Sequence, residues 1–150
     1  MLVGNDHVIR PFEVPDWWLR FGAFDWGSAK PFSMGWYAVS DGSVLPDGRR
    51  YPAGALIRYR EWYGASSPNV GLKMTAEQVA AGIRAREGDE EIVYRVADPA
   101  CWKRDGGPSI VERMLGEGVL FGRADNVPWA ARLIKLSNIR ALPDVHRVWI

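Results

Sequence analysis

The sequence has a single cysteine, Cys101, among its 150 residues. One cysteine excludes a disulfide within the chain and is typical of a protein in a reducing compartment. The sequence also lacks any apolar run close to the roughly 18 residues that a membrane span requires, and its first residues lack the charged-then-apolar pattern of a secretory signal. We therefore expect a cytosolic protein that has no membrane partner.

Net charge is also nearly absent, because 19 Lys and Arg residues face 18 Asp and Glu residues, for a formal net charge of +1. No global basic field marks the chain as a nucleic-acid-binding protein, so a contact with DNA would require a local patch. The two histidines, His7 and His146, stand alone and show no metal-ligand spacing. The phosphate-binding Gly-x-x-x-x-Gly-Lys-Ser/Thr loop, the dinucleotide fingerprint, the Gly-x-Ser-x-Gly elbow and the His-Glu-x-x-His motif are all missing.

Hydrophobic residues, in contrast, are abundant at 47%, and eight of them are tryptophans. A chain of this length can bury a real core as one domain. The tryptophans could pack in that core or stack on nucleic-acid bases. We favour packing, because basic residues do not alternate regularly with the rings.

Three strands are indicated in the first half of the chain, at 19–25, 32–40 and 54–63. Strong turn signals, Asp41-Gly42 and Pro46-Asp47-Gly48, separate the second strand from the third. Since only turns and loops join these strands, we expect them to be antiparallel neighbours.

Two capping boxes mark helix starts in the second half. Thr75 with Gln78 begins a helix that ends at Gly88, and Ser109 with Glu112 begins a second helix that closes near Gly116 or Gly118. The pattern then predicts a fourth strand at 91–97, a short fifth strand at 119–121 and a third helix at 129–136.

This element order predicts a mixed α/β fold with a five-stranded sheet, three antiparallel strands followed by parallel ones, flanked by helices. A right-handed crossover would place strand 91–97 beside strand 19–25. We divide the chain into an N-terminal lead-in (1–18), one domain (19–136) and a C-terminal tail (137–150).

Two aspartates stand where apolar strands end. Asp25 closes the run Phe21–Phe24 and precedes Gly27, and Asp98 closes a second apolar run just before Pro99. If the two strands are neighbours, both carboxylates meet at one end of the sheet, where their repulsion favours a bound cation. Mg²⁺ prefers one or two carboxylates, several waters and a phosphate oxygen. The competing interpretation is that each aspartate only caps a turn.

Two further segments are weaker candidates. Asp125, after the fifth strand, could supply a third carboxylate or could belong to a turn before Pro128. The glycine-rich segment 105–109 could present backbone N–H groups to a phosphate, although a plain capped turn is the simpler interpretation.

Several of these segments together resemble the nuclease domain of phage large terminase subunits. The resemblance rests on Phe24-Asp-Trp-Gly-Ser-Ala29, Arg58-Tyr-Arg-Glu-Trp-Tyr-Gly64, Val96-Ala-Asp-Pro-Ala100 and Gly106-Gly-Pro-Ser-Ile110, in this order within residues 10–126. It implies an RNase H-like fold and a Mg²⁺- or Mn²⁺-dependent endonuclease that cuts concatemeric viral DNA during genome packaging. By this resemblance, Asp25 matches the family's metal ligand on the first strand, and Asp98 matches the acid at the end of the fourth strand. Both would be metal ligands and catalytic residues.

The resemblance also implies partners: double-stranded DNA, an ATPase motor domain, the portal and the small terminase subunit, in the cytoplasm of a bacterial host. The chain departs from the family in two ways. It has no ATPase motif, and its last stretch offers only Asp144 where the family has an acid-rich segment with a third metal ligand. We therefore expect a truncated or divergent member whose metal centre is incomplete.

Two alternatives stay open on the sequence. The chain could be a non-catalytic remnant or binding module with an RNase H-like fold, or another RNase H-like nuclease of the resolvase or integrase type. For a nuclease, the candidate phosphate contacts are Lys30, Arg49, Arg50, Lys103, Arg104 and Arg123. Each of these side chains is also explicable as a solvated surface charge, and for any one of them alone we favour that interpretation.

Overall fold

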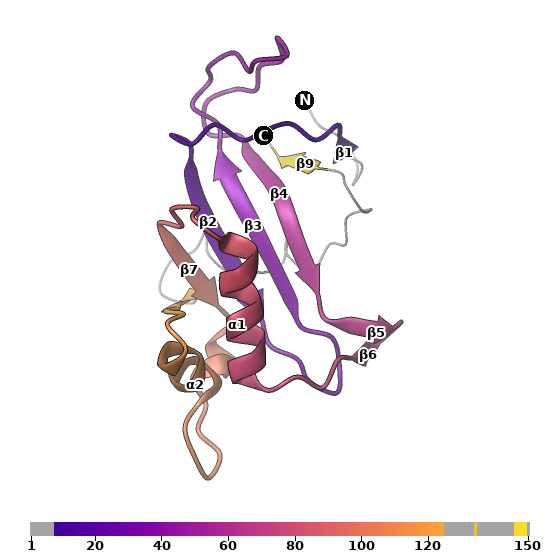
Figure 1. Ribbon diagram of the computed structural model, residues 1–150, viewed down its shortest axis with the longest axis vertical. Coiled ribbons are helices and arrows are strands. Elements are labelled where there is room, and N and C mark those ends of the chain that lie inside the picture. Colours follow the sequence, from indigo (N-terminus) through magenta and orange to yellow (C-terminus); the bar gives the residue numbers. More distant parts are fainter. Residues whose placement is uncertain (1–7, 125–133, 135–145, 150) are drawn as a thin grey trace.

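The computed structural model describes residues 8–124, 134 and 146–149 (Figure 1). These residues form a seven-stranded mixed sheet whose strands lie in the order β1-β9-β4-β3-β2-β7-β8. The strands are β1 (Val8–Ile9), β2 (Leu19–Asp25), β3 (Ser33–Val39), β4 (Leu56–Tyr63), β7 (Tyr94–Ala97), β8 (Gly122–Arg123) and β9 (His146–Trp149). A separate two-stranded hairpin, β5 (Ala65–Ser67) with β6 (Val70–Gly71), extends from the end of β4.

The meander predicted for the first half is confirmed. Strand β2 pairs antiparallel with β3, and β3 pairs antiparallel with β4. Asp25 pairs with Ser33, which in turn pairs with Tyr63, so these three residues form a row at one end of the sheet. The turns of segment 40–55 therefore lie at the opposite end.

The predicted crossover is confirmed as well. Helix α1 (Ala76–Glu87) carries the chain back across the sheet, and β7 then pairs parallel with β2. The Thr75 hydroxyl accepts a hydrogen bond from the Gln78 N–H (3.1 Å), and the Gln78 side chain accepts one from the Thr75 N–H (2.9 Å). The same reciprocal cap, Ser109 with Glu112, begins α2 (Ile110–Gly116). Local capping chemistry thus sets both helix starts.

Both helices cover the same face of the sheet, as Figure 1 shows for α1 in front of the strands. The sheet contributes Phe24, Met34 and Trp36 to the buried cluster beneath them. The helices contribute Val79 and Ile83 from α1 and Val111 and Met114 from α2. A second cluster, with Ala23, Tyr37, Val96 and Ile134, covers the other face. In the part of the chain described, no helix has the length and apolarity that crossing a bilayer demands.

The tryptophans mainly pack, as the sequence suggested. Trp36 and Trp18 are buried, and Trp26, Trp62 and Trp102 pack against the cluster beneath the helices. Among the tryptophans that the structure describes, Trp17 is the exception, because it is 68% exposed and its indole N–H donates to Asp41.

Three details differ from the sequence-based expectation. The fifth strand is not at 119–121 but at Gly122–Arg123, because Val119 and Phe121 alternate inward to fill the core beneath the helices. Strand β7 begins only at Tyr94, after a segment in which Glu90 binds Arg60. Strands β1 and β9 pair with each other and β9 pairs with β4, so the sheet has seven strands instead of the predicted five. The lead-in thus contributes a strand. The predicted helix 129–136 falls outside the described residues except for Ile134.

Candidate functional site

Asp25 and Asp98 lie side by side at the carboxyl end of two parallel strands. Ala23 pairs with Val96 and Phe24 with Ala97, and the Asp98 N–H donates to the Phe24 carbonyl at 3.2 Å. One step further along each strand, Asp25 and Asp98 are the next neighbours. Residues paired in parallel strands face the same side of a sheet, and Ala23 and Val96 share one buried cluster. Alternation therefore assigns both aspartates to that same side.

The residues that follow each aspartate explain why each strand stops there. After Asp98, Pro99 begins the short 3-10 helix η1 (Pro99–Trp102), and the Asp98 carboxylate caps it by accepting from the Ala100 N–H at 2.9 Å. The turn-cap interpretation of Asp98 is thus correct, but this bond uses only one carboxylate oxygen, Oδ1. After Asp25 the chain turns so tightly that a Cβ at Gly27 would come within 2.4 Å of the Lys30 and Pro31 carbonyl oxygens.

Cys101 lies close to the ends of both strands, which the sequence did not indicate. Its thiol is 1% exposed and accepts a hydrogen bond from the backbone N–H of Trp26. Burial, with smaller contributions from the negative charges of Asp98 and Asp25, raises the pKa of Cys101 to about 12. Both carboxylates therefore act on one thiol, which stays neutral and is not a nucleophile at physiological pH.

The chemistry of this donor set fits Mg²⁺ or Mn²⁺. Hard divalent cations bind carboxylate oxygens and, in phosphoryl-transfer sites, take their remaining ligands from waters and substrate phosphates. Within residues 8–124 and the few described beyond them, no group of three or more His, Cys, Asp or Glu side chains is arranged to hold a metal. The two other acids considered from the sequence, Asp125 and Asp144, lie outside the described residues.

The structure brings three of the predicted phosphate contacts to this end of the sheet. Lys30 is exposed in the loop after Asp25, and Lys103 is exposed directly after η1. Arg123 ends β8 opposite Ala97, with its guanidinium 5.5 Å from the centre of the Trp102 ring. A DNA-binding role for these side chains remains a prediction.

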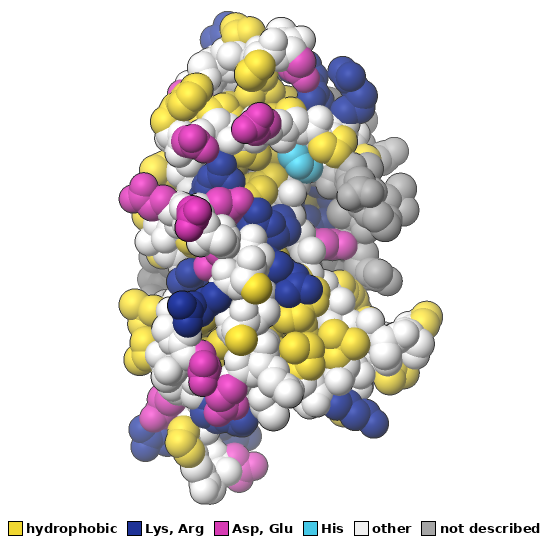
Figure 2. All heavy atoms as spheres, in the orientation of Figure 1, with side chains coloured by type: hydrophobic (Ala, Val, Ile, Leu, Met, Phe, Trp, Pro, Cys, Tyr) yellow, Lys and Arg dark blue, Asp and Glu magenta, His cyan; other side chains and the backbone are white. Residues whose placement is uncertain are grey.

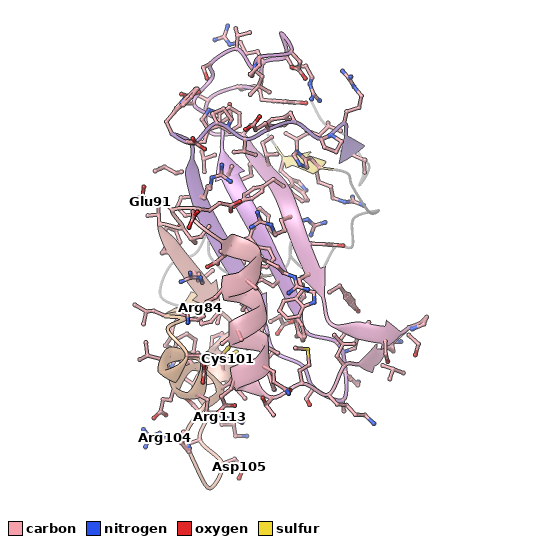
Figure 3. All side chains as sticks on the ribbon, viewed as in Figure 1. Arg84, Glu91, Cys101, Arg104, Asp105 and Arg113 are labelled. Carbon is pink, nitrogen blue, oxygen red and sulfur yellow. The ribbon has the colours of Figure 1, made fainter. Side chains whose placement is uncertain are left out.

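The other basic candidates have different surroundings. Arg104, on the loop below α2 (Figure 3), forms two hydrogen bonds of 2.7 Å with the Glu112 carboxylate, so its charge is paired although its side chain is 71% exposed. Arg49 and Arg50 lie in the turns at the opposite end of the sheet, where Arg49 donates to the carbonyl oxygens of Arg10 and Pro11. The structure therefore does not bring these two arginines near Asp25 and Asp98.

The glycine-rich segment 105–109 is an ordinary capped turn. The Glu112 carboxylate accepts from the Ser109 N–H and the Ser109 hydroxyl accepts from the Glu112 N–H, so the cap itself occupies both N–H groups. Gly106 provides the positive φ (+73°) that the turn requires. Nothing in this geometry favours a bound phosphate over the cap.

Comparison with solved structures identifies proteins that have a similar fold. The chain superposes on the nuclease domain of the P22 large terminase with a TM-score of 0.55 and 16% sequence identity, covering 90% of this chain and 66% of that one. The large terminase from the thermophilic bacteriophage D6E gives a TM-score of 0.55 and 15% identity, over 90% of this chain and 31% of that chain. No protein-family model and no curated protein matches the sequence. The predicted mixed α/β, RNase H-like fold of terminase nuclease domains is confirmed.

Proposed function

We propose that the chain is a metal-dependent DNA endonuclease domain of the large-terminase type, with Asp25 and Asp98 as metal ligands. The observation that carries this proposal is the parallel register of β2 and β7, which makes the two aspartates neighbours at one strand end. The fold shared with terminase nuclease domains also supports it.

The chemistry follows from the residues at this edge. When bound, Mg²⁺ or Mn²⁺ supplies a Lewis acid that lowers the pKa of water and neutralises charge on the scissile phosphate. Asp25 and Asp98 would hold and orient the ion, and the neutral thiol of the nearby Cys101 would add no competing charge. Lys30, Lys103 and Arg123 bind backbone phosphates. Cleavage is then largely independent of base sequence, because phosphate contacts carry no base information.

The proposed partners follow from the same likeness. The chain spans less than two thirds of the P22 domain and about a third of the D6E terminase. Within a packaging machine it would act on double-stranded DNA, together with an ATPase motor domain, the portal and the small terminase subunit in the cytoplasm of the bacterial host.

Nicking of supercoiled plasmid in Mn²⁺ tests the proposal. We expect Asp25→Asn and Asp98→Asn each to reduce the nicking rate at least about 100-fold, since even residues that only support a metal ligand cost 10–100-fold when lost. Asp89→Asn is the matched control, because Asp89 is an exposed acid in the loop after α1. EDTA should abolish nicking. Equal nicking by the two variants and the wild type would exclude these aspartates.

A non-catalytic binding module is the second candidate. It is favoured by one observation, that the described residues offer no third His, Cys, Asp or Glu to complete a metal site. Titration with Mn²⁺ separates the two, because a module with a dead site would not bind the ion at millimolar concentration. If nicking occurs, four-way-junction and linear DNA as substrates would reveal a resolvase-type or integrase-type enzyme by preferential cleavage of one of them.

A further inference from the structure

Two residues other than glycine have a positive φ in the part of the chain that the structure describes, and both flank β6. Asn69 has φ +60° and Lys73 has φ +58°. Asparagine adopts this conformation readily, whereas lysine does so at a cost in free energy. If position 73 served only to turn the chain toward α1, glycine or asparagine would do so with less strain. A strained residue that persists points to a use for its side chain.

Lys73 is fixed to the segment that leaves the candidate active site. Its backbone N–H donates to the Ser28 carbonyl at 3.2 Å, and the Gly71 N–H donates to the Ala29 carbonyl at 2.8 Å. A Cβ at Gly71 would come within 2.0 Å of the Ser28 oxygen, so the two segments are in direct contact. Lys73 is thus bonded to a residue only three positions after Asp25.

The Lys73 ammonium group is also available to bind an anion. Its side chain is exposed, and none of the ion pairs found among the described residues includes Lys73, Lys30 or Lys103. Lys30 and Lys73 belong to segments on the β3–β4 side of Asp25, and Lys103 follows η1 on the β7 side. Lys and Arg side chains appear on both sides of the lower end of the molecule in Figure 2. In the order of the sheet, these three lysines therefore lie on both sides of the paired carboxylates.

We propose that Lys73 is a DNA-binding residue that contacts a backbone phosphate next to the scissile bond, and that its strained backbone holds the ammonium group on the rim of the site. This inference rests on the proposed function and extends it to a residue that the sequence did not indicate. A flexible ammonium group suits a phosphate oxygen as a point charge.

Salt-dependent binding tests the inference without relying on cleavage. Anisotropy of a short fluorescein-labelled duplex, measured in Ca²⁺ over about 50–200 mM salt, gives the slope of log K against log salt, which changes by about 0.9 for each phosphate contact. We expect Lys73→Gln to make that slope shallower by about 0.9 and Lys73→Arg to preserve it. Lys73→Gly should lose the contact while raising the thermal midpoint by about 2 °C, because it relieves strain.

Two controls separate this role from a structural one. Asn69→Gly changes the other positive-φ residue, and Arg50→Gln removes one charge at the far end of the sheet; both should keep the wild-type slope. A wild-type slope in Lys73→Gln, or no salt-dependent binding by the wild-type chain, would overturn the inference. Loss of nicking in the aspartate variants has no bearing on it, and normal binding without nicking would overturn only the proposed function.

Discussion

Glu87 joins three elements of the fold, and its removal should be among the most damaging substitutions in the chain. It is the last residue of α1 and is 5% exposed. Its carboxylate accepts a hydrogen bond from the buried indole N–H of Trp36 on β3 at 3.0 Å. It also accepts two from the Arg95 guanidinium on β7, of which the Nε bond is 2.8 Å. One carboxylate therefore ties α1 to both strands.

The expected cost follows from what Glu87→Ala would leave behind. The Arg95 side chain, 17% exposed, would lose its counter-ion, and the Trp36 donor would be buried without an acceptor. Removing one partner of a buried ion pair costs about 3–5 kcal/mol. For a urea m-value of about 2 kcal/mol/M, the unfolding midpoint would fall by about 1.5–2.5 M. Glu87→Gln keeps the shape and one acceptor oxygen, so its effect should be smaller.

Urea unfolding followed by tryptophan fluorescence measures this change. Glu77→Ala is the control, because Glu77 also binds an arginine, Arg113, but that pair is half-exposed and should contribute less. A double variant, Glu87→Leu with Arg95→Met, should recover part of the loss, since it leaves no unpaired cation. If Glu87→Ala shifts the midpoint no more than Glu77→Ala does, the buried network does not stabilise the fold as argued.

Two predictions concern titratable groups. Burial, with a smaller effect from the positive charge of Arg49, lowers the pKa of His146 to about 4 from an ordinary 6.5. The folded state therefore favours neutral His146. The contribution of His146 to the free energy of unfolding should be fully present above pH 6.5 and should be lost as the pH drops toward 4. The thermal midpoint of the His146→Leu variant should vary less over that range than the midpoint of the wild type. Because the Cys101 thiol is 1% exposed and its pKa is raised to about 12, iodoacetamide at pH 8 should modify only unfolded protein. Rapid alkylation of the native chain would contradict that burial.

The features that the sequence predicted well depend on interactions among near neighbours. The capping boxes at Thr75 and Ser109 define where both helices begin, because each cap is formed within three residues. Strands β2, β3 and β4 were also predictable, since clear turn signals bound the apolar runs. The adjacency of Asp25 and Asp98 followed from this element order and the general rule for crossovers.

Other features depend on contacts that form only when the chain folds, and no local pattern encodes them. The alternation of Val119 and Phe121 resembles a strand, but the core beneath the helices claims both side chains and strand pairing begins only at Gly122. Arg104 looked like a free cation until folding placed Glu112 against it. Strand β1 forms because a segment near the other end of the chain, β9, lies beside it.

The order of the elements and the two acids at strand ends can be read from the chain, because capping, turn formation and apolar periodicity act over a few residues. Which charges are available around those acids depends on packing. Folding pairs Arg104 with Glu112, places Arg49 at the far end of the sheet and bonds Lys73 to the segment after Asp25. The physical reason is that ion pairing and exposure are fixed by through-space neighbours, and those neighbours exist only once the sheet and helices have packed.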